Sequence, residues 1–262
     1  MKRDQSTVEH RRSQILKKIR EEESVKVEDL AQEFGMSAMS VRRDLQYLED
    51  RKLISRFYGG ATINPHYRTV SPAEELQLYR RLLGRYAATQ ILDGETVFIN
   101  GSMSALGLID HISARNIHVV TNNGNAVMVK PPKNVTLTLT GGELRGHVLV
   151  GDTVLRGLLD FHADRTFIGC AGVTAEGEFS YNIPMEISIN ETMIARTTKE
   201  LYILADHTKL ENTDADHTRY GSCTYDRQVT LITDEKANPR TVEKLRSLGI
   251  RVHQVGIHDV NF

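Results

Sequence analysis

The sequence predicts an α/β protein of two domains, a small helical one followed by a larger one with a mostly parallel sheet. In the first, apolar residues recur at helical spacing through residues 8–48, and a short alternating segment with two glycines follows. From residue 93 onward, short β-branched runs alternate with helical segments, which is typical of a parallel sheet covered by helices. We place the first domain at residues 1–64, a proline-containing linker at 65–73 and the second domain at 74–262.

Three helices are predicted in the first domain. The first runs from about Val8 to Glu22, and the second covers Val27–Phe34, where four apolar residues form one stripe. Gly35 then suits the left-handed end of a helix. Ser37 is a good N-cap for the third helix, because its hydroxyl can accept a free backbone N–H. A short helix, a glycine turn and a capped helix form a helix-turn-helix, whose second helix enters DNA.

The third helix, which begins within Met36–Leu45, has two different faces. At about 100° per residue, Val41, Leu45 and Leu48 gather on one side and face a core. The opposite side carries guanidinium and amide groups, with hydroxyl groups on the flank. Arginine can pair bidentately with guanine, and glutamine with adenine. The alternative is an ordinary solvated helix face, which the flanking motifs argue against.

Leu53–Ile63, LISRFYGGATI, predicts a β-hairpin that would form a wing beside the third helix. Two short alternating segments flank Gly59-Gly60, and glycine permits the positive φ of a tight turn. Side chains on this hairpin would project where phosphates or a minor groove could be met. The residues expected to contact DNA are Ser37, Met39, Ser40, Arg42, Arg43, Gln46, Tyr47, Arg56 and Tyr58.

The charge of the whole chain does not indicate nucleic-acid binding, since its formal net charge is -1. A DNA-binding surface must therefore be local. Residues 1–64 carry thirteen Lys and Arg against eleven Asp and Glu, a net charge of +2. The basic residues that could cluster on one side are Lys2, Arg3, Arg11, Arg12, Arg42 and Arg43.

The two cysteines, Cys170 and Cys223, have no CxxC or secretory pattern around them, which favours a reduced, cytoplasmic setting. No apolar run approaches the length of a membrane span, so we expect no membrane partner. We expect no cofactor and no metal. Four potential ligands near one another lack a recognisable ligand spacing; they are His207, Asp214, Asp216 and His217.

Seven strands and six helices are expected in the second domain. The strands are Thr96–Ile99, His118–Val120, Thr136–Leu139, Arg165–Gly169, Leu201–Leu204, Val229–Ile232 and Arg251–Val255. The helices are Glu74–Ile91, Ala105–Ile112, Asn125–Val129, Thr153–Leu159, Glu186–Thr198 and Arg240–Ser247.

Small, polar loops follow four of these strands: NGSMS (100–104), TNNGN (121–125), TGGELR (140–145) and ADHTK (205–209). In an open α/β sheet, ligands bind outside the carboxyl ends of the strands, and a loop at a helix N-terminus can bind an anion. NGSMS, just before the helix expected at Ala105, fits a phosphate best. The residues expected to contact an effector are Asn100, Gly101, Ser102, Ser104, Asn122, Gly141, Gly142, Arg145, Glu186, Asp206 and Lys209.

Four of these residues also have a structural interpretation. Glu186 begins a helix, where a carboxylate is favoured by the dipole. Asp206 and Lys209 could form an ion pair within one loop. Arg145 could pair with a phosphate or simply cover the edge of the sheet.

The stretch LAQEFGMSAMSVRRDLQYLEDRKLISRFYGGA resembles the N-terminal domain of the DeoR family of bacterial transcriptional regulators. It departs from the family pattern at four positions, with Met36 for Val, Ser40 for Thr, Lys52 for Gly and Tyr58 for His. The Tyr58 departure alters a wing contact.

The second domain is similar to the sugar-phosphate-sensing domain of this family, in segments such as DGETVFIN, VVTNN, LTGGELR, ADRTFIG and ILADHTK. The resemblance implies a fold like that of ribose-5-phosphate isomerase and glucosamine-6-phosphate deaminase. Where the family usually has D-S-G-T-T, this chain has the NGSMS loop, and Tyr79-Arg80 replaces the usual E-K.

The resemblance implies a DNA-binding transcriptional regulator and not an enzyme. We expect a repressor of carbohydrate transport or catabolism genes that a phosphorylated sugar releases from operator DNA. We also expect a homo-oligomer, a dimer or tetramer held by the second domain, that binds paired half-sites. The alternative is a sugar-phosphate isomerase or deaminase with a DNA-binding domain, whose acid and base would come from Glu186, Asp206 and Lys209.

Overall fold

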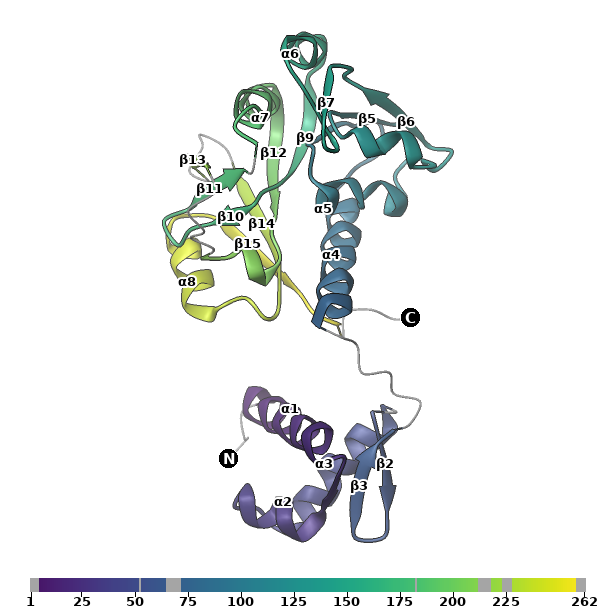
Figure 1. The fold of residues 1–262 in the computed structure, drawn as a ribbon, viewed down its shortest axis with the longest axis vertical. Helices are drawn as coiled ribbons and strands as arrows, with labels where there is room; N and C mark the ends of the chain where they lie inside the picture. Colours follow the sequence, from purple (N-terminus) through teal and green to yellow (C-terminus); the bar gives the residue numbers. More distant parts are fainter. Residues whose placement is uncertain are drawn as a thin grey trace. The chain divides into compact units, whose positions relative to one another are not determined.

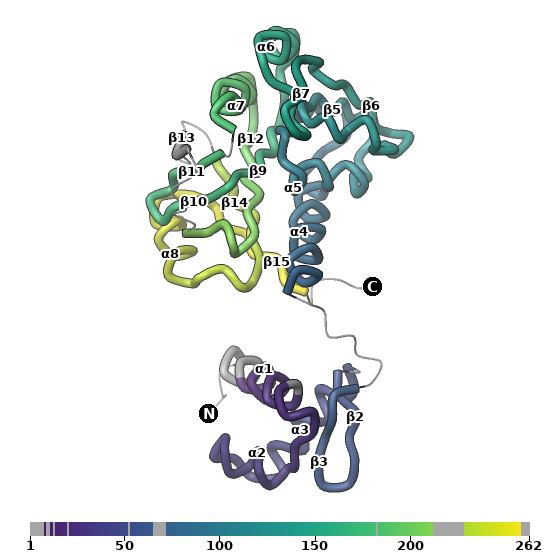
Figure 2. Tube along the Cα trace, in the orientation of Figure 1, coloured from purple at the N-terminus to yellow at the C-terminus, as the bar shows by residue number. Residues whose placement is uncertain are grey.

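The computed structural model describes residues 5–51, 53–64, 72–181, 183–211, 218–222 and 228–257 (Figures 1 and 2). The chain forms two compact units, residues 1–71 and 72–262. Pro72 and Ala73, which we assigned to the linker, are the first residues of helix α4 (Pro72–Thr89). The rest of the expected linker lies outside the described residues.

The first unit contains the predicted helices and the predicted wing. The helices are α1 (Gln5–Glu22), α2 (Val27–Glu33) and α3 (Ala38–Asp50), and the wing strands are β2 (Ile54–Phe57) and β3 (Gly60–Ile63). Ser37 caps α3 as expected, since its hydroxyl accepts the backbone N–H of Ser40 at 3.2 Å. Gly35 has a φ of +58°, which confirms the left-handed turn between α2 and α3.

One strand of this unit was not predicted. β1 (Ser24–Lys26) pairs antiparallel with β3, so the wing belongs to a three-stranded sheet of order β1-β3-β2. Only Val25 of these three residues is buried, and so short a strand shows no alternation to detect. The core of the unit contains the expected stripe of Val41, Leu45 and Leu48, packed with Ile15 and other buried side chains.

The second unit is built on a parallel sheet of seven strands, and all seven predicted strands belong to it. Their order is β15-β14-β12-β9-β4-β5-β6, with every neighbouring pair parallel. The strands are β4 (Thr96–Ile99), β5 (Ile117–Thr121), β6 (Val135–Leu139), β9 (Ala163–Gly169), β12 (Thr197–Leu204), β14 (Val229–Asp234) and β15 (Arg251–Val255).

Helices bury both faces of this sheet, and its inner strands therefore consist mostly of apolar residues. Along β4, Val97 and Ile99 pack in the cluster that contains α4, whereas Phe98 packs with α6 (Asp152–Leu159) and α7 (Glu186–Ala195). α8 (Pro239–Ser247) contributes to a third apolar cluster with β12 and β14. No helix among the described residues is long and apolar enough to cross a membrane.

Several short elements differ from the predictions. The helix expected at Ala105–Ile112 is a four-residue helix, α5 (Met103–Leu106), followed by a 3-10 turn. The segment expected as helix Asn125–Val129 is the 3-10 helix η2 (Gly124–Met128). TGGELR does not remain a loop, because part of it forms β7 (Glu143–Arg145) in a hairpin with β8 (Val148–Val150). A small antiparallel sheet was also missed; it contains β10 (Gly172–Val173), β11 (Glu178–Tyr181) and β13 (Thr218–Ser222).

Candidate DNA-binding surface and ligand site

The outer face of α3 carries the side chains that the sequence places there. Met39, Arg42, Arg43 and Gln46 are exposed, and Ser40 is half-buried beside the N-cap. Neither Arg42 nor Arg43 makes an ion pair within the described part of the chain, so both guanidinium groups retain their donors. Two unpaired guanidinium groups on one exposed helix face can bind phosphates or base edges.

Asp44 holds α1 against this helix and changes one expectation. Its carboxylate is 1% exposed and accepts from Arg11 Nε at 2.8 Å and from Arg12 Nε at 2.9 Å. Arg11 and Arg12, which we expected could cluster on one side with Arg42 and Arg43, are therefore committed to Asp44. Their guanidinium groups compensate a buried carboxylate, which would otherwise be costly to desolvate.

Tyr47 also supports the surface instead of projecting from it. Its half-buried ring lies between two guanidinium groups, with the Arg12 carbon 3.6 Å and the Arg51 carbon 4.0 Å from the ring centroid. Both contacts are cation–π interactions. Arg12 is thus fixed twice, by Asp44 and by Tyr47, which links α1 rigidly to α3.

Arg56 connects the wing to the recognition helix. Its backbone N–H donates to Glu49 Oε1 at 3.0 Å, and its guanidinium donates to Gln46 Oε1. Gln46 Nε2 in turn donates to Asp50 Oδ1 at 2.8 Å. The Gln46 amide is thereby oriented, yet each of its polar atoms retains one further hydrogen-bonding position. The wing and α3 consequently form one surface of fixed geometry.

In the second unit, the buried side chain of Asn100 holds the NGSMS loop in place by hydrogen bonds. The side chain is fully buried; Nδ2 donates to the Gly169 carbonyl at 2.9 Å, and Oδ1 accepts from Gly169 N at 3.0 Å and Ser102 N at 3.2 Å. We expected Asn100 to contact an effector. The structure instead uses both ends of its amide to join the ends of β4 and β9.

Ser102 caps α5, and its hydroxyl accepts the backbone N–H of Ser104 at 3.2 Å. A Cβ at Gly169 would lie 1.9 Å from Ser102 Oγ, so only glycine allows this close approach. The dipole that α5 directs at this loop is weaker than expected, because a helix of four residues sums few peptide dipoles. The backbone N–H groups of Met103 and Ala105 nevertheless have no partner among the described residues.

Asn123, and not Asn122, contacts this loop. Asn123 Nδ2 donates to the carbonyls of Gly101 at 2.8 Å and Ser102 at 3.2 Å. The predicted residue Asn122 instead donates to the Leu149 carbonyl at 3.1 Å. Successive residues at a strand end point to opposite sides, so the neighbour of the predicted residue reaches the loop.

The acidic group of Glu186 lies beside the loop. It begins α7 and is 8% exposed, and a Cβ at Gly101 would lie 3.0 Å from its Oε1 and 2.8 Å from the Val148 methyl carbons. Burial raises the pKa of the Glu186 carboxyl to about 7. One turn later, both amide atoms of Asn190 are buried without a hydrogen-bond partner among the described residues.

Asp206 is buried and paired, but not with Lys209. Arg80 Nε donates to its Oδ2 at 2.8 Å, and Thr208 N donates to Oδ1 at 3.1 Å. Burial alone would raise the pKa of Asp206, but the hydrogen bonds from Thr208 and Arg80 outweigh it and hold the pKa below its usual value. In the sequence, Arg80 stands out only as a departure from the family pattern, which gives no sign of this contact.

The remaining predicted ligand residues do not join the loop. Gly141 and Gly142 have positive φ and lead into the β7–β8 hairpin. A Cβ at Gly142 would lie 2.7 Å from the Val150 carbonyl oxygen, so this glycine serves the hairpin. Arg145 is exposed and forms an ion pair with Glu143 of the same strand at 2.6 Å. The half-buried Lys209 ends the short 3-10 segment η3 (His207–Lys209) that follows β12.

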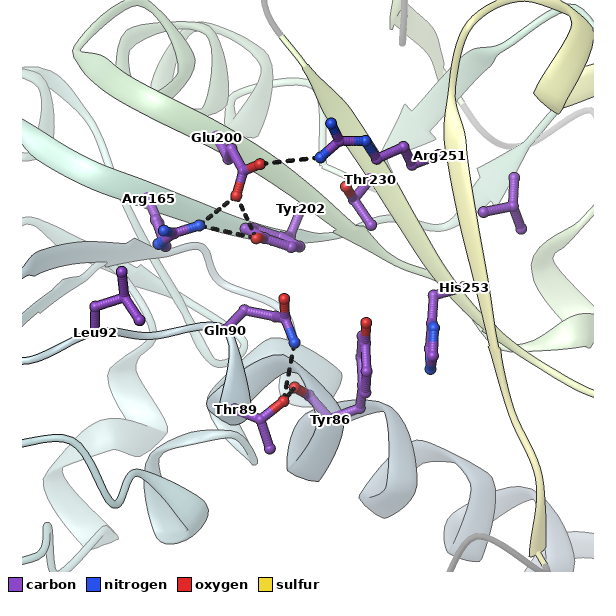
Figure 3. A pocket seen from close by; sticks show the side chains of 11 residues that line it. Tyr86, Thr89, Gln90, Leu92, Arg165, Glu200, Tyr202, Thr230, Arg251 and His253 are labelled. Carbon is purple, nitrogen blue, oxygen red and sulfur yellow. Dashed lines mark hydrogen bonds and ion pairs between the residues drawn. The ribbon is translucent and has the colours of Figure 1, made fainter.

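A separate cavity of about 420 Å³ lies near the amino ends of β14 and β15, and none of the predicted site residues lines it (Figure 3). Its charged groups are paired with one another. Arg165 bonds to Glu200 and to the hydroxyl of Tyr202, and Arg251 donates to Glu200 at 3.3 Å. The rings of Tyr86 and His253 stack 3.6 Å apart at its side.

No group of three or more His, Cys, Asp or Glu side chains that could hold a metal ion occurs in the described part of the chain. Asp214, Asp216 and His217, weighed as ligands in the sequence, lie outside that part, as does Cys223. Cys170 is a buried free thiol, and burial raises its pKa to about 11.

Comparison with known proteins gives matches in both units. The model of a DeoR-like helix-turn-helix domain matches residues 11–66, and that of a DeoR C terminal sensor domain matches residues 77–235. The chain is 29% identical to the glycerol-3-phosphate regulon repressor of Escherichia coli, over 76% of this chain and 81% of that protein. It is 27% identical to the transcriptional repressor GlcR of Bacillus subtilis, over 93% and 95%.

Among solved structures, the chain is similar to ribose 5-phosphate isomerase from Plasmodium falciparum. The TM-score is 0.36 with 11% identity, over 51% of this chain and 52% of that one. A similarity of this size carries no argument about function.

Proposed function

This chain belongs to the DeoR family of bacterial transcriptional regulators, and we propose that it is a repressor released from operator DNA by a phosphorylated sugar. The observation that carries the proposal is the exposed face of α3, where Arg42 and Arg43 are unpaired beside a wing that Arg56 ties to Gln46. The relatives named above are repressors, one of them of a glycerol-3-phosphate regulon. The genes we propose as targets are those of carbohydrate transport or catabolism.

On DNA, we assign different functions to the two arginines. Arg43 lies opposite the buried stripe of α3, so it reaches base edges in the major groove. Arg42 lies on the flank and contacts phosphate, which positions the helix without reading sequence. The second unit holds two copies of the chain together, so that both helices engage half-sites with a high effective concentration.

The effector group we propose is a phosphate held by the NGSMS loop. Ser102 and Ser104 supply hydroxyls, and the free N–H groups of Met103 and Ala105 supply donors. Lys209, in the segment that follows β12, is the cation that we propose to approach this phosphate once it is bound. Glu186 lies on the other side of Gly101, in position to meet a sugar hydroxyl.

We propose a regulator without catalytic activity. An isomerase needs a free acid and base beside the substrate carbonyl. Asp206 is committed to Arg80 and Thr208 and is not free to act as that acid or base. These contacts favour a sensor over the isomerase or deaminase alternative.

The test is to select operators from a random duplex library with the full-length chain and then add a panel of sugar phosphates. We expect sequence-selective binding that one phosphorylated sugar weakens and its unphosphorylated form does not. Turnover of a sugar phosphate would support the enzyme instead. Binding without sequence preference would overturn the proposal.

Ser102→Glu separates the loop from other ligand sites, because it places a negative charge where the phosphate would bind. We expect this variant to bind operator normally and no longer respond to the sugar phosphate. Ser188→Glu is the matched control, since Ser188 is exposed on α7. Equal responses of wild type and Ser102→Glu would show that the effector binds elsewhere.

A further inference from the structure

The tip of the wing presents two aromatic side chains to water. Tyr58 is 104% exposed and Phe57 is 48% exposed, next to each other at the turn between β2 and β3. An exposed aromatic pair forgoes the free energy that burial would supply. Exposed apolar groups gathered at one tip indicate a contact surface.

The backbone of this tip is braced against β1, so the turn that carries Tyr58 is held in a fixed position. Gly59, with a φ of +85°, makes the turn, and its carbonyl accepts the backbone N–H of Val27 at 2.9 Å. A Cβ at Gly60 would lie 2.3 Å from the Val25 carbonyl oxygen and 2.5 Å from the Phe57 ring. The tip is therefore packed closely against β1, with the Phe57 ring over Gly60.

The distance from the tip to the reading face of α3 is fixed as well. Arg56, two residues before Tyr58, bonds through its backbone to Glu49 and through its side chain to Gln46. When α3 occupies a major groove, a wing held in this way reaches a set position beside it. Preorganisation of this kind reduces the ordering cost of binding.

Charge does not explain what the tip would bind. From Phe57 to Asn64 the hairpin contains no charged residue, whereas contacts to phosphate are made mostly by Lys and Arg. Aromatic rings instead stack on bases, and apolar wedges unstack a base step from the minor groove side. Pyrimidine–purine steps such as TA unstack most readily.

We propose that Tyr58, carried on this braced turn, is a stacking wedge that inserts into the minor groove next to the half-site and selects a flexible pyrimidine–purine step there. This inference rests on the proposed function, because it presupposes that α3 lies in the adjacent major groove. It assigns sequence selection to a position that α3 does not contact.

The experiment uses the full-length chain and an operator that wild type selects from a random duplex library. Binding is measured over a range of salt concentrations for wild type, Tyr58→Ala and Tyr58→Phe. We expect Tyr58→Ala to lose roughly 10-fold in affinity, with an unchanged slope of log affinity against log salt, because no ionic contact is lost. Tyr58→Phe keeps the ring and should retain most of the affinity. Leu248→Ala, which truncates an exposed apolar residue of the second unit, is the control.

A fluorescent base reports the wedge directly. 2-Aminopurine brightens when it unstacks, and the chain contains no tryptophan to obscure the signal. With the analogue at the step beside the half-site, wild type should raise the emission and Tyr58→Ala should not. Replacing the flexible step by a stiff A-tract should weaken wild type and leave Tyr58→Ala unaffected.

Two results would overturn the wedge while leaving the proposed function intact. One is operator binding by Tyr58→Ala equal to that of wild type. The other is a loss on every sequence with a shallower salt slope, which would mean a phosphate contact. If wild type itself selects no operator, the proposed function fails and this inference fails with it.

Discussion

Glu186 makes the stability of the second unit depend on pH near neutrality. Its pKa is about 7 in the folded chain because of burial, compared with 4.5 for an unperturbed glutamate. The folded state therefore binds this proton more tightly than the unfolded state does. The corresponding stabilisation is complete below pH 4.5, decreases as the pH rises, and is gone above about pH 7. A pKa difference of this size corresponds to roughly 3 kcal/mol.

Glu186→Gln removes the titration while keeping the shape of the side chain. We expect the variant to be more stable than wild type at pH 8, by up to roughly 3 kcal/mol, and to show little pH dependence between pH 5 and pH 8. Scanning calorimetry of the full chain across this range measures the transition of the second unit. Carbon NMR of labelled glutamate side chains measures the titration itself, and the variant identifies the resonance.

Glu191→Gln is the matched control, because Glu191 is exposed on the same helix and its substitution removes an equal charge. It should leave the pH dependence of wild type unchanged. If Glu186→Gln and wild type lose stability in parallel from pH 5 to pH 8, burial does not raise the pKa of the Glu186 carboxyl. A titration midpoint near 4.5 for Glu186 would show the same independently.

Three further predictions concern the first unit. Arg43→Ala should cost roughly 1–3 kcal/mol on the selected operator and relax its sequence preference, whereas Arg42→Ala should weaken all DNA similarly; competition binding against random duplex distinguishes them. Residues 1–64 alone should fold but bind operator far more weakly than the full chain, which gel-shift titration of both proteins would measure. Asp44→Asn should destabilise this unit by roughly 2–3 kcal/mol, because Arg11 and Arg12 lose a buried carboxylate partner. Urea unfolding at neutral pH measures this, and an unchanged urea midpoint would contradict it.

The large elements were predictable because their residues alternate between environments in a regular way. α3 shows its buried stripe and its cap in a single stretch of sequence. The inner strands of the sheet are buried on both faces, which requires runs of apolar residues that loops do not contain. In both cases the pattern lies within one element, where sequence spacing and spatial spacing agree.

The contacts of the ligand site were less predictable because their partners are distant in sequence. Asn100 bonds to a residue 69 positions away, and Arg80 bonds to one 126 positions away. The packing of β4 against β9 and of α4 against the end of β12 therefore determines which polar residues remain available for a ligand. The prediction that Asn122 contacts the ligand loop was wrong for a local reason. A shift of one residue reverses the direction of a side chain at a strand end, so Asn123 reaches the loop instead.

Asn100 shows how the NGSMS loop is held in place without the acidic residue of the family pattern. An aspartate at this position could accept from the N–H groups of Gly169 and Ser102, but it could not donate to the Gly169 carbonyl. Two oxygens would then face each other where the amide now makes a 2.9 Å hydrogen bond. The asparagine closes the loop without a negative charge, and the neighbouring Glu186 carboxyl is neutral below about pH 7. Both features would reduce repulsion of the dianionic phosphate that we propose beside Ser102.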